Sequence, residues 1–231
     1  MFSLRPPRLR VKIVSGLERW AGLLAVLNIA MIAILLGRPS FSNASRPVRG
    51  ITNPVLAMEV VRNIAEVDAI LSDAPSPDRE VMRIKEYTGF AFIGCYGALF
   101  VVMGMMLARE GRGLAIAAGS FGVLAAVCDA IGNFGILRGV DVDLSHTTQA
   151  MIDAIRYPNL IKWALVACSL GLFGLLLPRK PGVMFRIVGA VEMLAALLAL
   201  LGLFSNQILA WTGIPMLAGF LGLAILYFRP F

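Results

Sequence analysis

Long apolar blocks alternate with short polar connections along this chain. Each block has about the 20 residues that a helix needs to cross a bilayer. The blocks lie near residues 20–37, 88–108, 114–137, 159–177, 184–204 and 208–228. A transmembrane barrel would instead show alternating segments of about 10 residues, and the sequence has none. The pattern predicts an all-α integral membrane protein with six transmembrane helices in a single membrane domain over residues 1–231.

A different periodicity occurs in the polar loop 38–87. Apolar residues recur there three and four positions apart: Leu56, Val60, Ile64, Val67 and Leu71. This spacing predicts an amphipathic helix over 54–71, with Asn53 as its cap and Pro54 at its first position. We expect this helix to lie outside the cytoplasm, either on the membrane surface or capping the bundle. Beyond it, Pro77 begins a helix that continues into the second block.

Charge sets the expected orientation. The chain has a net charge of +7, which alone would suggest a nucleic-acid partner. Four segments that share one side of the membrane are net basic: 1–19, 109–112, 178–186 and 229–231. Because cytoplasmic loops carry an excess of lysine and arginine, both termini are predicted to be cytoplasmic, in a plasma (bacterial inner) membrane. This orientation accounts for the basic excess without nucleic acid.

The third block contains two polar residues, Asp129 and Asn133, one helical turn apart. They share a helix face with small residues, among them Ala118, Gly122 and Ala125. Small residues at this spacing allow helices to approach closely, so the face is expected to point into the bundle. A central carboxylate costs about 2.5–3.5 kcal/mol to insert, which favours a partner for Asp129. Two candidates are Lys162, at a matching depth, and Tyr96. The contact could hold helices together, bind a ligand or handle a proton.

The fifth block holds a second acid, Glu192, about two turns from its cytoplasmic end. This depth places it too far from Asp129 for direct contact. Asn28 and Arg186 are its candidate partners; the alternative is that the acid stays protonated without a partner. Two acids at different depths could outline a path for protons or cations, although separate helix contacts are the simpler explanation.

Motifs of enzymes and cofactor sites are largely missing. The sequence has no HExxH, GxSxG or Walker lysine loop, and its one histidine cannot form a bis-histidine haem site. The loop after the third block offers Asp141, Asp143 and His146 as weak metal ligands. We therefore predict no cofactor and no metal, with bound lipids, and we lean towards a protein that is not an enzyme.

Four short motifs resemble a family of bacterial multi-pass membrane proteins whose activity is not known. They are "MEVVRNIAEVDAIL" (58–71), "CYGALF" (95–100), "CDAIGNFGIL" (128–137) and "IKWALVACSLGLFGLLL" (161–177). The resemblance covers about the first 180 residues and implies the membrane architecture alone. By residue it includes Glu59, Tyr96, Asp129, Asn133 and Lys162. The chain departs from the family pattern at Gly132 and Gly89, where the pattern has acids.

Three functions remain open on this basis. The first is an accessory or scaffold subunit that binds other membrane proteins, suggested by the small-residue faces and the few reactive side chains. The second is a small proton- or ion-coupled transporter that uses Asp129 and Glu192. The third is a membrane-embedded enzyme that modifies lipids.

Overall fold

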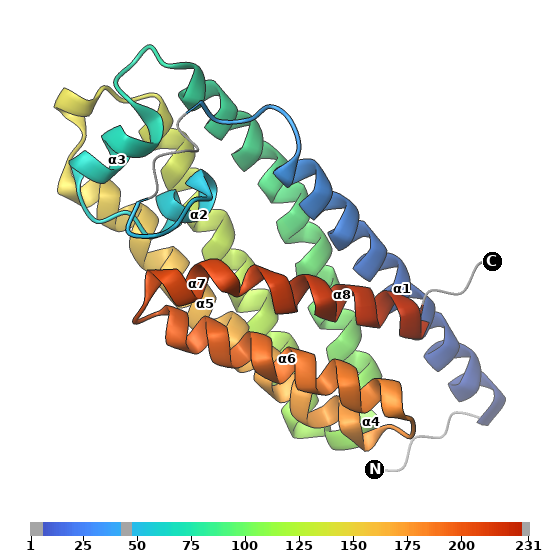
Figure 1. Ribbon diagram of the computed structural model, residues 1–231. Helices are drawn as coiled ribbons and strands as arrows, with labels where there is room; N and C mark the ends of the chain where they lie inside the picture. Colours follow the sequence, from blue (N-terminus) through green and yellow to red (C-terminus); the bar gives the residue numbers. More distant parts are fainter. Residues whose placement is uncertain (1–6, 43–47, 228–231) are drawn as a thin grey trace.

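The computed structural model describes residues 7–42 and 48–227, and this part of the chain forms a bundle of helices without strands (Figure 1). The helices follow in the order α1 (Pro7–Leu36), α2 (Pro54–Glu59), α3 (Ile64–Leu71), α4 (Pro77–Val140), α5 (Gln149–Leu176), α6 (Val183–Gly202), α7 (Asn206–Trp211) and α8 (Gly213–Tyr227). Two short 3₁₀ turns complete the list, η1 (Leu144–His146) and η2 (Leu177–Arg179).

Helices long and apolar enough to cross a membrane make up most of the structure. In the described residues there are five: Gly16–Leu36, Pro77–Val140, Gln149–Arg179, Val183–Gly202 and Asn206–Tyr227. The first and fourth agree with the predicted blocks 20–37 and 184–204 to within four residues. The protein is therefore an all-helical membrane protein.

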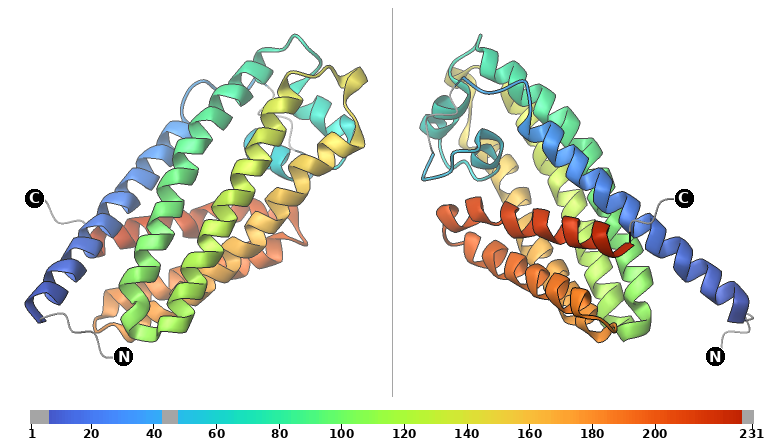
Figure 2. Two further views of the ribbon diagram at one scale, coloured as in Figure 1. Left: turned by 180° about the vertical axis from the view of Figure 1, so that it is seen from behind. Right: turned by 45° about the vertical axis from the view of Figure 1, so that its right-hand side comes forward.

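Helix α4 contains two of the predicted blocks in one segment of 64 residues. Its backbone leaves the helical conformation at Gly111 (φ 172°, ψ 90°), and the chain reverses direction there. Residues 77–110 and 112–140 consequently form two antiparallel arms, with α1 beside the first and α5 beside the second (Figure 2).

Small residues bring the two arms of α4 together. A Cβ atom added to Gly104 would lie 3.0 Å from the carbonyl oxygen of Ala115, and one added to Gly122 would lie 2.2 Å from Cδ2 of Phe100. Ala118 and Ala125, on the same face as Gly122, are fully buried. The small-residue face predicted for the third block thus packs against the preceding arm.

This close approach makes Gly122 sensitive to a single methyl group. Gly122→Ala is expected to lower the free energy of unfolding by about 1–3 kcal/mol, because the new methyl group overlaps Phe100 down to its Cβ atom. Gly94→Ala is the matched control, since a Cβ at Gly94 has nothing within 4 Å. The free energy of unfolding of this control should rise by up to about 1 kcal/mol, because alanine has a higher helix propensity than glycine. The stability of both variants can be measured by unfolding in SDS, followed by circular dichroism. Equal effects of Gly122→Ala and Gly94→Ala would contradict the packing argument.

Residues 48–76, which we call the cap, cover one end of the bundle (Figure 1). The cap does not contain the single helix predicted over 54–71. The chain forms α2 and α3 instead, because Asn63 adopts an extended backbone (φ −154°, ψ 169°) and its side chain accepts a hydrogen bond from the amide of Glu66. The carboxylate of Glu66 in turn accepts one from the amide of Arg62. These two bonds cap the start of a new helix and leave Ile64, a member of the predicted stripe, exposed.

Two further helix boundaries differ from prediction. Helix α5 begins at Gln149, ten residues before the predicted block 159–177, because Thr148 caps it and Pro158 is accommodated inside the helix. The predicted block 208–228 is divided into α7 and α8 at Thr212, and residue 228 lies outside the described residues.

The turns that connect α5 to α6 and the two arms of α4 lie at the end of the bundle opposite the cap. Arg179, in η2, donates a hydrogen bond to the carbonyl oxygen of Glu110 beside the α4 reversal (2.8 Å). Lys180 forms an ion pair with Glu18 of α1 (3.2 Å) and contacts the hydroxyl group of Tyr227 of α8 (3.3 Å). These contacts bring α1, α4, α5 and α8 together at one end.

Candidate functional site

Asp129 lies at the centre of a buried polar network in the half of the bundle that the cap covers. Its Oδ2 atom accepts a hydrogen bond from the hydroxyl group of Tyr96 (2.8 Å), and its Oδ1 atom pairs with Nζ of Lys162 (3.0 Å). All three residues are at most 8% exposed. The two partners suggested for Asp129 by the sequence are thus both present, one from the first arm of α4 and one from α5.

Glu59 of the cap helix α2 completes the network. Its Oε2 atom lies 2.6 Å from Nζ of Lys162 and accepts a hydrogen bond from Nε1 of Trp163 (3.0 Å). Burial raises the pKa of Glu59, an effect that Lys162 opposes and Asp129 reinforces. One lysine therefore serves two carboxylates, and it ties the cap to the membrane helices.

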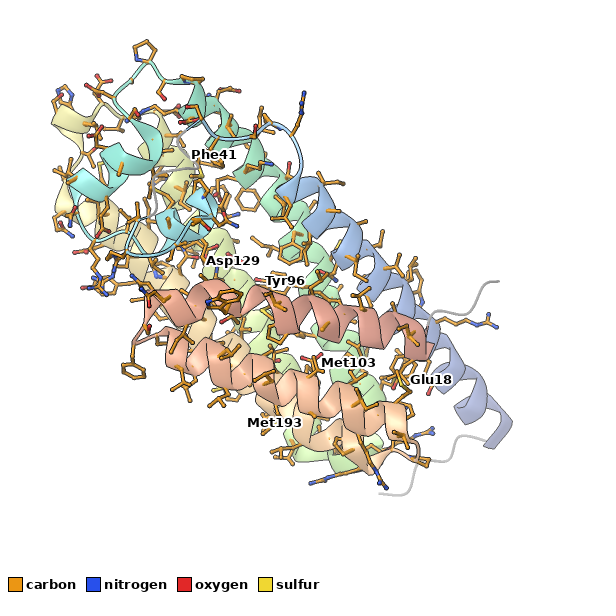
Figure 3. The ribbon with its side chains drawn as sticks, viewed as in Figure 1. Glu18, Phe41, Tyr96, Met103, Asp129 and Met193 are labelled. Atoms are coloured by element: carbon orange, nitrogen blue, oxygen red, sulfur yellow. The ribbon has the colours of Figure 1, made fainter. Side chains whose placement is uncertain are left out.

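A cavity of about 310 Å³ borders this network. Its polar wall contains Glu59, Tyr96, Asp129, Lys162 and Asn133. The rest of the wall is mainly apolar and comes from the end of α1, α2, the first arm of α4, α5, α7 and α8: Leu35, Val55, Leu56, Phe92, Ile93, Phe100, Val166, Leu209, Met216 and Phe220. In Figure 3, Asp129 and Tyr96 lie near α2, whereas Met103 and Glu18 lie towards the opposite end of the bundle.

Two further charged residues line the cavity, both from the first arm of α4. Lys85 donates hydrogen bonds to the carbonyl oxygens of Leu35 (2.7 Å) and Gly37 (2.6 Å), and it thereby caps the C-terminus of α1. Glu86 is 2% exposed. Among the described residues no donor reaches its Oε1 atom, and it takes part in no ion pair.

Gly89 and Gly132 are the two positions where the chain has glycine and the similar family pattern has an acid. An amide side chain occupies the space beside each of them. A Cβ atom at Gly89 would lie 2.8 Å from Nδ2 of Asn133, which lines the cavity. A Cβ atom at Gly132 would lie 2.4 Å from Nδ2 of Asn159, which is fully buried. Both glycines therefore leave room for a neighbouring amide group.

Glu192 and Asn28 lie outside the cavity that borders Asp129. Glu192 is 5% exposed and, among the described residues, pairs with neither Asn28 nor Arg186. It lines a much smaller space that shares the side chains of Phe100, Met216 and Phe220 with the larger cavity. Asn28 instead donates to the carbonyl oxygen of Leu24 in its own helix (2.8 Å).

The weak metal candidates after α4 take other roles. Asp141 pairs with Arg83 (2.5 Å), and the Nδ1 atom of His146 lies 3.2 Å from the hydroxyl group of Ser145. Asp143 precedes η1, and its carbonyl oxygen accepts a hydrogen bond from Thr147 (3.1 Å). Within the described ranges, no three histidine, cysteine, aspartate or glutamate side chains are placed to hold a metal ion.

Sequence reasoning named Lys162 and Tyr96 as partners of Asp129, but it did not place Glu59, Trp163, Lys85 and Glu86 beside them. Glu59 lies three residues after Leu56 on the same helix face, and both residues line the cavity. Its position relative to the predicted apolar stripe was therefore a usable signal. Trp163 follows Lys162 directly and faces the same acid. Lys85 and Glu86 precede the second predicted block, where charged residues are ordinarily solvated, and no local pattern marks them as buried.

Comparison of the chain with protein-family models, with curated proteins and with solved structures finds no match. The geometry of the cavity is therefore the basis on which a function is inferred.

Proposed function

We propose that the protein binds a small amphipathic molecule in the cavity beneath the cap. One observation supports this above the others: a buried network of Glu59, Lys162, Asp129 and Tyr96 borders an apolar cavity of about 310 Å³. Small-molecule sites commonly have volumes of about 300–1,000 Å³, with mainly apolar walls and a few converging polar groups. An accessory subunit needs complementary outer surfaces but no such cavity, so the cavity favours binding over a purely structural role.

A photoreactive probe tests this proposal. Trifluoromethyl-diazirinyl benzyl alcohol combines an apolar ring with one polar group and labels whatever it touches on illumination. The full chain in nanodiscs of neutral lipid should be labelled saturably at the cavity walls, at residues such as Phe92, Val166 and Met216, as mapped by peptide mass spectrometry. Labelling that rises linearly with probe concentration and falls only on lipid-facing side chains would refute the proposal.

A matched pair of glycine variants sharpens this test. Gly213 lines the cavity, and a Cβ atom there has nothing within 4 Å, so Gly213→Leu should fold and fill part of the cavity. We expect it to reduce labelling of the cavity walls several-fold. Gly94→Leu, whose position is equally open but lies away from the cavity, should leave labelling unchanged.

We further propose that the chain crosses the plasma membrane six times with both termini in the cytoplasm. The reversal of α4 supports six crossings, since each of its arms is long enough for one. Arg109, Arg112, Arg179 and Lys180 lie beside the turns at the end away from the cap, as the positive-inside rule requires of a cytoplasmic face. Thiol labelling of Ser145→Cys from the outside of intact cells tests this orientation, and protection of that cysteine would contradict it.

Ion-coupled transport of the bound molecule is a second candidate, favoured by Glu192. Its carboxyl group is buried and has no ion-pair partner among the described residues, and the space that it lines shares Phe100, Met216 and Phe220 with the binding cavity. Intramembrane acids of this kind commonly mark proton or ion pathways. Vesicles with a pH gradient distinguish the two candidates: transport predicts gradient-driven accumulation of the probe that Glu192→Gln abolishes, whereas a binding protein gives saturable labelling without accumulation.

A further inference from the structure

We infer that the molecule bound in the cavity is an organic cation, such as an amine with an apolar body, and that Glu86 is the residue that selects it. This inference rests on the proposed binding function and specifies the class of ligand. It follows from the balance of charged groups that line the cavity and from the character of its walls.

The acids that line the cavity outnumber the lysines. The described lining residues include three acids, Glu59, Glu86 and Asp129, and two lysines, Lys85 and Lys162. Lys162 is shared between Glu59 and Asp129, and Lys85 is held by the carbonyl oxygens at the end of α1. Among the described lining residues, both lysines are thus engaged, and no cation is left for an anionic ligand.

Among the residues that the structure describes, Glu86 is the lining acid without an ion-pair partner. It lines the cavity and is 2% exposed, and no donor in the described part of the chain reaches its Oε1 atom. A buried carboxylate that lacks a partner is costly, and a cationic group in the cavity would supply both the charge and the hydrogen bonds that it lacks. A neutral ligand would supply at most the hydrogen bonds, so the charge balance favours the cation.

Aromatic side chains of the cavity wall suit the same ligand. The aromatic residues that line the cavity include Phe92, Tyr96, Phe100, Trp163 and Phe220. Ring faces attract cations within about 6 Å of their centroids, and Nζ of Lys162 already lies 5.1 Å from the centre of the Trp163 ring. The aromatic walls can therefore contact both the apolar body and the charged group of one amine.

Three photoreactive probes with the same apolar body test this inference. They are trifluoromethyl-diazirinyl benzylamine, benzyl alcohol and benzoic acid, which are cationic, neutral and anionic at pH 7. A charge-assisted hydrogen bond is worth about 10-fold or more in affinity, so cavity labelling by the amine should saturate at about 10-fold lower concentration than labelling by the alcohol. The acid should not label the cavity. This comparison needs only the unmodified protein in neutral-lipid nanodiscs.

The variant Glu86→Gln adds a residue-specific test. It should abolish the preference for the amine, so that amine and alcohol saturate the cavity at similar concentrations. Glu80→Gln is the matched control on the same helix, because the Glu80 side chain is 59% exposed and lies outside the cavity. Equal saturation by amine and alcohol in the unmodified protein, or a preference that survives in Glu86→Gln, would overturn the inference while leaving the proposed binding function intact. If none of the three probes labels the cavity, both proposals fail.

Discussion

Lys162→Met is expected to lower the free energy of unfolding by about 3–5 kcal/mol, one of the two largest effects that we predict. The substitution keeps much of the apolar stem but removes the one cation that Glu59 and Asp129 share, at distances of 2.6 and 3.0 Å. Breaking a buried ion pair by removing one partner costs this much because the remaining charge is left uncompensated. Unfolding in SDS, followed by circular dichroism, measures the loss.

Two further variants separate the loss of charge from the loss of packing. Adding Asp129→Asn and Glu59→Gln to Lys162→Met removes the uncompensated acids, so the triple variant should recover most of the lost stability. A triple variant as unstable as Lys162→Met alone would show that packing, not charge, causes the loss. Arg83→Met is the surface control: its partner Asp141 is 66% exposed, and exposed ion pairs contribute about 0–1 kcal/mol.

Much of this network could be predicted from local pattern. A carboxylate in an apolar run needs a partner, and the small residues on the face of Asp129 indicate which way it points. The depth of Lys162 in its own block then made the ion pair between α4 and α5 a specific expectation. This ion pair was predictable because the depth of a residue in a membrane is set by its position along its helix.

The cap and the cavity could not be predicted in the same way. The positions of α2 and α3 depend on the interruption at Asn63, whose capping pattern with Glu66 was present in the sequence but was outweighed by the apolar periodicity of 54–71. The burial of Lys85 and Glu86 depends on where the end of α1 and the loop before α2 come to lie, and this is a tertiary property. An empty volume leaves no periodicity at all, so the cavity between α2, α4, α5 and α8 becomes visible only in three dimensions.

Arg79→Met is expected to have the second large effect. It should lower the free energy of unfolding by about 2–4 kcal/mol, and the destabilisation should be concentrated in the cap. Arg79 is 4% exposed and donates hydrogen bonds to the carbonyl oxygens of Ser72 (3.0 Å), Val140 (2.9 Å) and Val142 (2.7 Å). It therefore joins the end of α3 to the segment between α4 and α5. Methionine cannot donate these bonds, and each buried carbonyl left unsatisfied costs about 1–3 kcal/mol.

Amide hydrogen exchange locates this loss. In Arg79→Met, exchange should accelerate in α3 and around η1, where the freed carbonyl groups lie, and stay unchanged in α6 and α8. Arg83→Met, one turn later on the same helix, should leave all four regions as they are. Uniform acceleration throughout the bundle would show that Arg79 supports the whole fold and not the cap in particular.

The same variant tests how the cap contributes to the proposed binding site. Helix α2 supplies Glu59 to the cavity and packs against α3 in the apolar cluster that also contains Met58, Val67 and Leu71. If α3 holds α2 in place, Arg79→Met should weaken cavity labelling by the benzyl alcohol probe although Arg79 lies outside the cavity wall. Unchanged labelling, despite faster exchange in α3, would mean that the contact between Glu59 and Lys162 is sufficient to position α2.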